Sequence, residues 1–451
     1  MRIFLFKVDE SNYEIMASTL QVFGVSNEIV ESYIEREQVD GFFQNALTLN
    51  KQIVVYGSSK QGKTSLIKKH LKLDNIISIQ CSPSMNLVDV YSSVLRQNDI
   101  QILTESSEQE TVYREASGSV KAKIKIPLIA EIEAGASGTG GKDTTKVNQF
   151  RTVEYNLSLA QDISEILKSI NFQKYIVLDN FHYLEESVQK QFAFDLRIFQ
   201  ETDIRFIILG IWRERNRLTQ FNGDLQDRVV EVAVEPWEKP DFERVLEKGS
   251  GVLNADFSQI SDELCQSSFD SIGVFQELCK ETCLAVKLLK SSDQKVVIVK
   301  DDLHVAINKK LSDYSGRHLR SFETFADSAS KSRYGQVPLF IPYYFLRVLL
   351  SSNFDNIVKG LTRKEIQQEI TKIHHRPYDI RASDMSNFLQ SITKYQIGKM
   401  INPPLFDYDR SINTLKIIDS TLYFFLRNCN REEVFDDITP PSDKLNLSQK
   451  S

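Results

Sequence analysis

Short apolar runs rich in β-branched residues alternate with amphipathic stretches over the first half of the chain. The runs at residues 52–56, 76–81, 175–178 and 206–209 are typical of buried strands. Between them, apolar residues at three- and four-residue spacing predict helices, for example over residues 87–95. Strands that alternate with helices predict an α/β fold in which a parallel sheet is covered by helices on both faces.

The segments on either side of this region have a helical pattern. Residues 12–47 predict helices that lead into the first strand, and the apolar spacing after Trp237 predicts a helical lid. The predicted organisation is an N-terminal helical approach segment (1–50), an α/β core (51–240), a helical lid (241–311), a polar linker (312–336), a compact C-terminal unit (337–430) and a disordered tail (431–451).

The C-terminal unit has the element order of a winged helix-turn-helix. Thr362 and Glu365 have the spacing of a capping box, which predicts the start of its second helix. The predicted elements are helices over 341–350, 363–372 and 383–395, a hairpin over 405–418 and a last helix over 420–428.

An insertion at about residues 104–148 interrupts the α/β pattern. Lys121, Lys123 and Lys125 alternate with Ala and Ile, which predicts a strand with one charged and one apolar face, and a glycine cluster follows. Two interpretations stay open. The insertion is either a solvated hairpin or mobile loop, or a basic ribbon that contacts nucleic acid or a neighbouring subunit.

Composition limits the function classes. The chain has 451 residues, of which 41% are hydrophobic and 26% are charged, and a formal net charge of -6. This balance argues against a protein that coats nucleic acid, so any DNA contact has to be local. The scattered cysteines lack zinc-site spacing and are interpreted as reduced thiols, with Cys279 and Cys283 as small apolar groups on a buried helix face. Neither a signal peptide nor a membrane span is apparent, so we expect a cytoplasmic protein with no membrane partner.

A phosphate-binding motif follows the first strand. Its glycines let backbone N–H groups close around a phosphate, the following helix adds its positive N-terminus, and Lys63 adds a point charge. Thr64 is the predicted Mg²⁺ ligand within the loop. The motif predicts binding of ATP with Mg²⁺ by Gly57, Ser58, Ser59, Lys60, Gln61, Gly62, Lys63, Thr64 and Ser65.

A carboxylate at the end of a neighbouring strand is needed to hold the magnesium ion, and Asp179 has that position. The next residue is Asn180, whose amide orients water but cannot take its proton. Hydrolysis is then slow, or Glu185 or Glu186 serves as the base; these glutamates are more simply exposed residues at a helix start. His182 is interpreted as structural.

Arginines supply the remaining candidates. Arg213, Arg215 and Arg217 follow the strand at 206–209, where an ATPase would sense the γ-phosphate. Arg228 reaches either into an adjacent subunit as an arginine finger or into a simple salt bridge with Asp224 or Asp227.

These motifs together resemble the AAA+ superclass, in particular its origin-recognition-like and STAND-like prokaryotic branch. The resemblance runs from Tyr33 to about Ile418 and rests on the 33–37 segment, the P-loop, the 178–182 strand end, the 224–228 box with Pro236-Trp237, the lid and the winged helix. It implies an ATP-controlled switch or assembly, with Arg36 near the adenine pocket and Arg228 acting in trans in a homo-oligomer. It also implies a setting in anti-phage defence or mobile elements.

Two departures from the family pattern point to slow turnover. Asn180 replaces the usual catalytic acid, and residues 271–276 contain no arginine where the lid sensor falls. The first hypothesis is therefore an ATPase that couples ATP binding or slow hydrolysis to oligomerisation and to double-stranded DNA or a separate effector protein. The alternative is a nucleotide-bound scaffold with negligible hydrolysis. DNA contact would use the mildly basic winged helix, with Arg363, Lys364, Lys372, His374, His375, Arg376 and Arg381.

Overall fold

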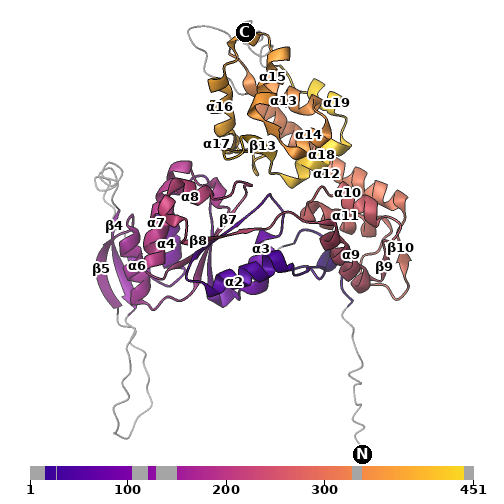
Figure 1. Ribbon diagram of the computed structural model, residues 1–451. Helices are drawn as coiled ribbons and strands as arrows, with labels where there is room; N and C mark the ends of the chain where they lie inside the picture. The colour runs from indigo at the N-terminus through magenta and orange to yellow at the C-terminus, as the bar shows by residue number, and fades with distance from the viewer. Residues whose placement is uncertain (1–15, 27, 104–119, 128–149, 328–337, 441–451) are drawn as a thin grey trace, which may run out of the picture. The chain divides into compact units, whose positions relative to one another are not determined.

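The computed structural model describes residues 16–26, 28–103, 120–127, 150–327 and 338–440 (Figure 1). The chain divides into two compact units. One comprises Met1–Ile34 and Trp237–Arg317, and the other comprises Glu35–Pro236 and His318–Ser451. The second unit holds the P-loop.

A five-stranded parallel sheet forms the centre of this unit. Its strands lie in the order β2-β6-β7-β1-β8, and every neighbouring pair is parallel. This arrangement confirms the predicted α/β fold. The bounds are β1 Gln52–Tyr56, β2 Ile76–Gln80, β6 Tyr175–Asp179, β7 Arg205–Gly210 and β8 Val229–Ala233.

Helices cover both faces of the sheet, because successive residues of a buried strand point to opposite sides. Val54 and Ile208 belong to the core under α4 (Leu87–Arg96), α6 (Ala160–Ser169) and α7 (Glu186–Glu201). Their neighbours Val55 and Leu209 belong to the core under α2 (Phe42–Thr48) and α3 (Lys63–His70). The continuous apolar runs in the sequence reflect this burial on both sides.

The insertion contributes the middle strand, β4 (Lys121–Pro127), of a three-stranded antiparallel sheet whose outer strands flank it in the sequence. The sheet consists of β3 (Gln101–Leu103), β4 and β5 (Phe150–Asn156), in the order β3-β4-β5. Ala122 and Ile124 are buried in the main core, whereas Lys121 and Lys123 are exposed. The predicted strand with one charged and one apolar face is confirmed, while the glycine cluster lies outside the described residues.

The C-terminal part of this unit is the predicted winged helix. Thr362 and Glu365 form the capping box at the start of α15, as expected. Residues 431–436 form α19 where a disordered tail was expected, and residues 441–451 lie outside the described part of the chain. The elements are α13 Ile341–Ser351, α14 Phe354–Lys359, β11 Leu361–Thr362, α15 Arg363–Ile373, α16 Ala382–Gln390, α17 Ile392–Gly398, β12 Phe406–Asp409, β13 Thr414–Ile417, α18 Ser420–Asn428 and α19 Arg431–Asp436.

The other unit is mostly helical. Its core includes Phe23, which packs so closely on Gly249 that a Cβ there would lie 2.1 Å from the Phe23 ring. The elements are α1 Thr19–Val22, α9 Lys239–Leu253, β9 Ala255–Asp256, α10 Ser261–Ser267, α11 Ile272–Ala285 and β10 Val296–Val297.

The N-terminal segment is less helical than its sequence predicts. Over the described residues from 16 to 47 the structure contains α1, a π-helical turn at Glu37–Gly41 and the start of α2, and residues 23–26 and 28–36 are not helical. Residues 12–15 lie outside the described range. Short helical turns elsewhere are Leu73–Asn75, Phe181–Tyr183, α8 Arg217–Phe221, Gly223–Leu225 and Pro377–Asp379.

A long helix, α12 (Lys300–Ala326), continues through residues 312–326, where the polar sequence had suggested a linker. Its apolar stripe explains the difference, because Tyr314, His318, Phe322 and Phe325 recur at helical spacing and are buried. The division between the two units falls within α12, after Arg317. No described helix is both long and apolar enough to cross a membrane.

Phe325 should be a stability anchor of the winged helix. Its ring meets those of Phe345, Phe388, Tyr395 and Phe406 at centroid distances of 5.5–6.2 Å. We expect Phe325→Ala to destabilise the chain by about 3–5 kcal/mol, because it leaves a cavity among aromatic rings. Val305→Ala, at an exposed site of α12, should change stability by less than about 0.5 kcal/mol. Urea unfolding followed by circular dichroism measures both variants, and equal midpoints would contradict the expectation.

Candidate nucleotide-binding site

The P-loop conformation depends on two glycines between β1 and α3. Gly57 has a φ of 151° and Gly62 a φ of 85°, a region that side chains with a Cβ rarely adopt. A Cβ on Gly57 would lie 2.6 Å from Cγ2 of Val234, whereas one on Gly62 would meet nothing within 4 Å. Gly57 thus allows β1 to pass close to the end of β8, and Gly62 borders open space at the start of α3.

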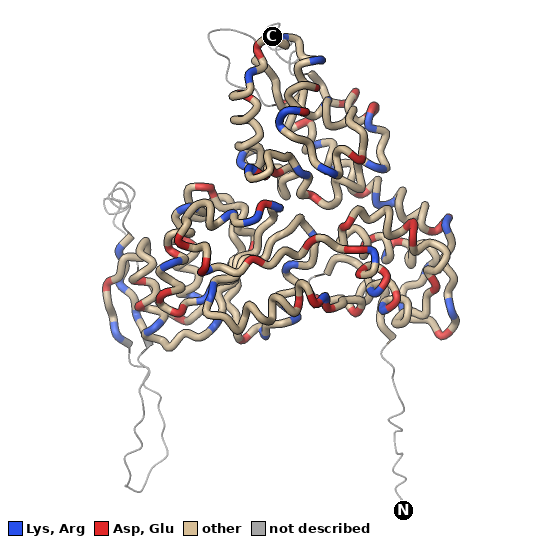
Figure 2. Tube along the Cα trace, in the orientation of Figure 1, with Lys and Arg blue, Asp and Glu red and all other residues tan. Residues whose placement is uncertain are grey.

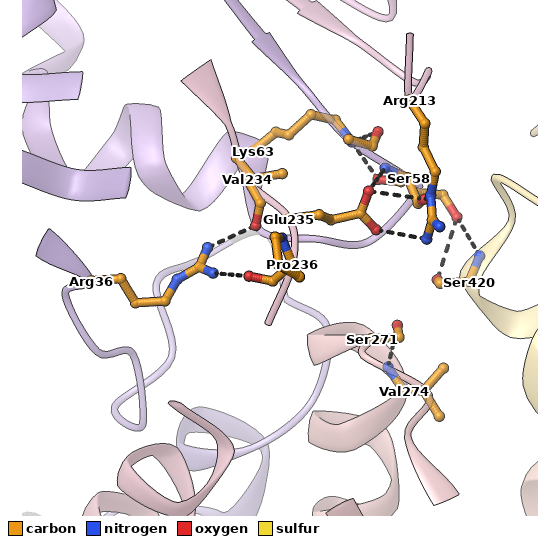
Figure 3. Close-up of polar contacts among 12 residues, drawn as sticks. Arg36, Ser58, Lys63, Arg213, Val234, Glu235, Pro236, Ser271, Val274 and Ser420 are labelled. Atoms are coloured by element: carbon orange, nitrogen blue, oxygen red, sulfur yellow. Dashed lines mark hydrogen bonds and ion pairs between the residues drawn. The ribbon is translucent and has the colours of Figure 1, made fainter. Parts of the chain in front are cut away.

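Lys63 is bonded to carbonyl oxygens of its own loop. Its Nζ donates to the oxygen of Gly57 at 2.9 Å and to that of Ser58 at 2.6 Å (Figure 3). Burial lowers the pKa of Lys63 to about 8, although the nearby carboxylates of Glu235 and Asp179 act in the opposite direction. A desolvated ammonium group held by neutral acceptors is suited to receive an anion.

The predicted magnesium side of the site lies at the end of β6. The Asp179 carboxylate accepts the backbone N–H of Asn180 at 2.8 Å and Nε2 of Gln80 at 3.2 Å. Asn180 has a φ of 58° and donates its amide to Oε1 of Gln80 at 3.0 Å. Gln80 was not among the residues predicted from the sequence. It is the last residue of β2, and the register of the sheet pairs it with Asp179 at the end of β6.

Glu235 and Arg213 form a second charged group on the loop. Glu235 Oε2 accepts the Ser58 N–H at 2.9 Å and also lies 3.2 Å from Ser58 Oγ. Arg213 donates Nε to Ser58 Oγ at 2.8 Å and pairs with Glu235 Oε1 at 3.2 Å (Figure 3). Of these two residues, sequence reasoning named Arg213 alone, because no motif marks a glutamate that follows β8.

The winged helix contacts the neighbouring residue of the P-loop. The Ser59 N–H donates to the Ile418 carbonyl at 3.0 Å, and the Ser420 N–H donates to Ser59 Oγ at 3.3 Å. Both partners lie where β13 leads into α18. Further along this interface, Arg217 approaches Asp407 at 4.0 Å, and Lys394 pairs with Glu185 at 3.4 Å.

The other candidate arginines are used in different ways. Arg36 is buried and donates to the carbonyls of Pro236 at 3.1 Å and Val234 at 2.9 Å, which fixes the turn after β8. Arg228 pairs with Glu201 at 3.3 Å, rather than with the two aspartates proposed from the sequence. Arg215 lies beside Tyr56.

The remaining candidates have structural contacts. Glu186 is half-buried at the start of α7, where an exposed residue was expected, and pairs with Lys190 at 2.7 Å. His182 is buried, and its Nδ1 accepts the Ile211 N–H at 3.4 Å. Burial holds the pKa of His182 well below its usual range. Cys279 and Cys283 are buried on α11, and the described residues contain no cluster of three or more His, Cys, Asp or Glu that could hold a metal ion.

The residues present fit a nucleotide with Mg²⁺. The space beside Gly62 is open, and Lys63 lies at the base of the loop. Thr64 is exposed in the first turn of α3. The N–H groups at the start of a helix have no partner within that helix and can bind an anion. Thr64 and Asp179 would hold the metal ion. The parallel sheet, the P-loop and the winged helix confirm the predicted P-loop α/β fold with a C-terminal winged helix.

Solved structures with similar folds cover most of the chain. A Walker-type ATPase of Pyrococcus abyssi is 14% identical, with a TM-score of 0.47, over 90% of this chain and 99% of that one. The ORC2 protein of Aeropyrum pernix, solved as ADPNP-ADP complexes, is 12% identical, with a TM-score of 0.44, over 92% of this chain and 97% of that one. The RuvB Holliday junction branch migration motor of Thermotoga maritima is 10% identical, with a TM-score of 0.35, over 84% and 87%. No protein-family model and no curated protein match the sequence.

Nucleotide affinity should fall at alkaline pH. The pKa of Lys63 is about 8 in the free chain, and a bound polyphosphate favours the charged form and raises that pKa. Binding above pH 8 therefore requires proton uptake. We expect the affinity for ATPγS to fall by about tenfold per pH unit between pH 8 and 9.5. Calorimetry measures this slope. Lys63→Arg is the control, because arginine stays charged and removes the slope; a flat wild-type profile would contradict the assignment.

Gly57 should tolerate no side chain. In Gly57→Ala the new methyl group meets Val234 in a backbone conformation that alanine avoids, and we expect a loss of about 1–3 kcal/mol in stability with weakened ATPγS binding. Gly223→Ala is the matched control, since a Cβ there meets nothing within 4 Å. Thermal unfolding and calorimetry compare the two variants, and equal behaviour would show that the close approach at Gly57 is unimportant.

Proposed function

We propose that the chain is a nucleotide-controlled switch in which ATP binding, or slow ATP hydrolysis, sets the position of the winged helix. The observation that supports this proposal is the direct contact of the winged helix with the P-loop at Ser59. A ligand that changes the loop acts on this contact without any intermediate element. In this proposal Arg36 lies near the adenine base, and the chain works in the cytoplasm, where its cysteines stay reduced.

Slow hydrolysis is supported by the surroundings of Asp179. A general base has to accept a proton from water, and the neighbouring side chains, Asn180 and Gln80, are amides that are bonded to each other. Amides can orient a water molecule, but they do not deprotonate it. Glu185, the alternative base, pairs with Lys394 of the winged helix.

DNA is the proposed partner of the released winged helix. The winged helix would contact the phosphates of the DNA backbone and would not recognise particular bases. The predicted third helix (383–395) is divided into α16 and α17; α16 contains no Lys or Arg, and Lys394 of α17 pairs with Glu185. Lys372 and Arg376 pair with acidic neighbours, and Figure 2 shows both signs of charge interspersed along this part of the chain. We therefore expect weak, salt-dependent DNA affinity with little sequence preference.

A homo-oligomer with Arg228 as an arginine finger is a further part of the proposal. Arg228 is partly exposed, so a neighbouring active site can compete with Glu201 for its guanidinium group. The second candidate function is a nucleotide-bound scaffold with negligible turnover. The amide pair beside Asp179 favours that candidate, since neither amide can accept a proton from water.

Turnover in four forms of the chain distinguishes these functions. We expect slow steady-state ATP hydrolysis by the wild type and no ATP binding by Lys63→Ala. Asn180→Glu should raise the rate by about 10²-fold, because it supplies a general base. Asn180→Gln is the control, with a longer side chain but no carboxylate. Each form is assayed with and without double-stranded DNA. Tight binding without wild-type turnover favours the scaffold, and failure of the wild type to bind ATP would contradict both functions.

A further inference from the structure

Arg213 lies where four parts of the larger unit meet. It follows β7, bonds to Ser58 of the P-loop and pairs with Glu235 after β8 (Figure 3). Its guanidinium lies 5.8 Å from the ring centroid of Tyr423 on α18. A cation over an aromatic face is attracted to it. One side chain therefore connects the phosphate-binding loop, the sheet and the winged helix.

Glu235 supplies an anion of the chain itself at the loop. Its carboxylate accepts the Ser58 N–H and pairs with Arg213, and the side chains of Arg213 and Glu235 are 27% and 15% exposed. An ion pair this sheltered is screened less by salt than a surface pair. Lys63 Nζ bonds to the carbonyl of the same Ser58, so the ammonium, the guanidinium and the carboxylate all meet at one residue.

The winged helix is bonded to the very next residue. Ser59 donates its N–H to Ile418 and accepts from the N–H of Ser420. Arg213 therefore bonds to the residue directly before Ser59. Its guanidinium also lies 5.8 Å from the ring centroid of Tyr423, three residues beyond Ser420.

We propose that Arg213 exchanges Glu235 for the terminal phosphate of a bound nucleoside triphosphate, and that this exchange releases the winged helix from the P-loop. The inference rests on the proposed nucleotide binding. A triphosphate held at Lys63 brings its outermost negative charge towards Ser58, where it attracts the guanidinium and repels the Glu235 carboxylate. A diphosphate lacks that group and leaves the Arg213–Glu235 pair and the docked winged helix in place. Glu235 thereby sets the discrimination between the two nucleotides.

Affinity ratios test the exchange. Calorimetry compares ADP and ATPγS on the full chain and on its variants. Glu235→Gln should increase affinity for ATPγS by about tenfold and leave that for ADP within about twofold, because it removes repulsion from the terminal phosphate alone. Arg213→Ala should reduce the preference for ATPγS over ADP by about tenfold, and Arg213→Lys should restore part of it. Arg197→Ala is the matched control, since Arg197 pairs with Glu201 and Asp224 on another part of the chain.

Cross-linking tests the release. The hydroxyl oxygens of Ser59 and Ser420 lie 3.5 Å apart, so the double substitution S59C/S420C should form a disulfide in the docked state. We expect mass spectrometry to find this bridge without nucleotide and with ADP, and ATPγS to slow its formation by at least about tenfold. In the Arg213→Ala background ATPγS should have no such effect.

The outcomes distinguish a failure of the proposed nucleotide binding from a failure of the Arg213 exchange. A wild-type chain that binds neither nucleotide contradicts the proposed function. Nucleotide binding that requires Lys63, with the same ADP to ATPγS ratio in wild type and Arg213→Ala, overturns the exchange alone. Equal cross-linking rates with ADP and ATPγS overturn the release. If substitution at Ser59 itself weakens binding, the affinity ratios of the Arg213 and Glu235 variants decide the question.

Discussion

A buried ammonium group held by two carbonyl oxygens is the interaction on which the site depends. Lys63 is removed from water by the loop that wraps it, and this desolvation disfavours its charge. The carboxylates of Asp179 and Glu235, at the ends of β6 and β8, offset part of that cost. The parallel sheet makes this possible, because it brings the carboxyl ends of its strands to one edge. The charge state of Lys63 therefore depends on the order and direction of the strands in the sheet.

The sequence predicted correctly those features that depend on residues close together in the chain. Buried strands such as β1 and the alternating residues of β4 have patterns set by their own burial, and the P-loop and Asp179 follow from the ends of such strands. The polar character of residues 312–326 was misleading, because α12 buries a narrow stripe and exposes the rest. The sequence did not predict the non-helical residues before the turn at Glu37–Gly41, since apolar spacing alone does not show which other element packs on a segment.

Contacts between segments far apart in the chain were the hardest features to predict from the sequence. Glu235 is one glutamate among many, and its position on Ser58 depends on the turn that Arg36 fixes after β8. The actual partner of Arg228 is Glu201, which lies on α7, whereas the sequence suggested aspartates next to Arg228 itself. Proximity in sequence is a weak guide to ion pairs when side chains are long and several acidic residues are in reach.

The bond between Ser59 and Ile418 joins two backbone groups, an amide and a carbonyl. Neither side chain takes part, so the residue types at these positions are free to change while the bond stays the same. Alanine scanning across the winged helix would leave it intact, and comparison of related sequences would give no sign of it. The contact between the loop and the winged helix can thus persist through extensive sequence divergence, and a proline at position 59, which lacks the N–H, is the change that removes the donor.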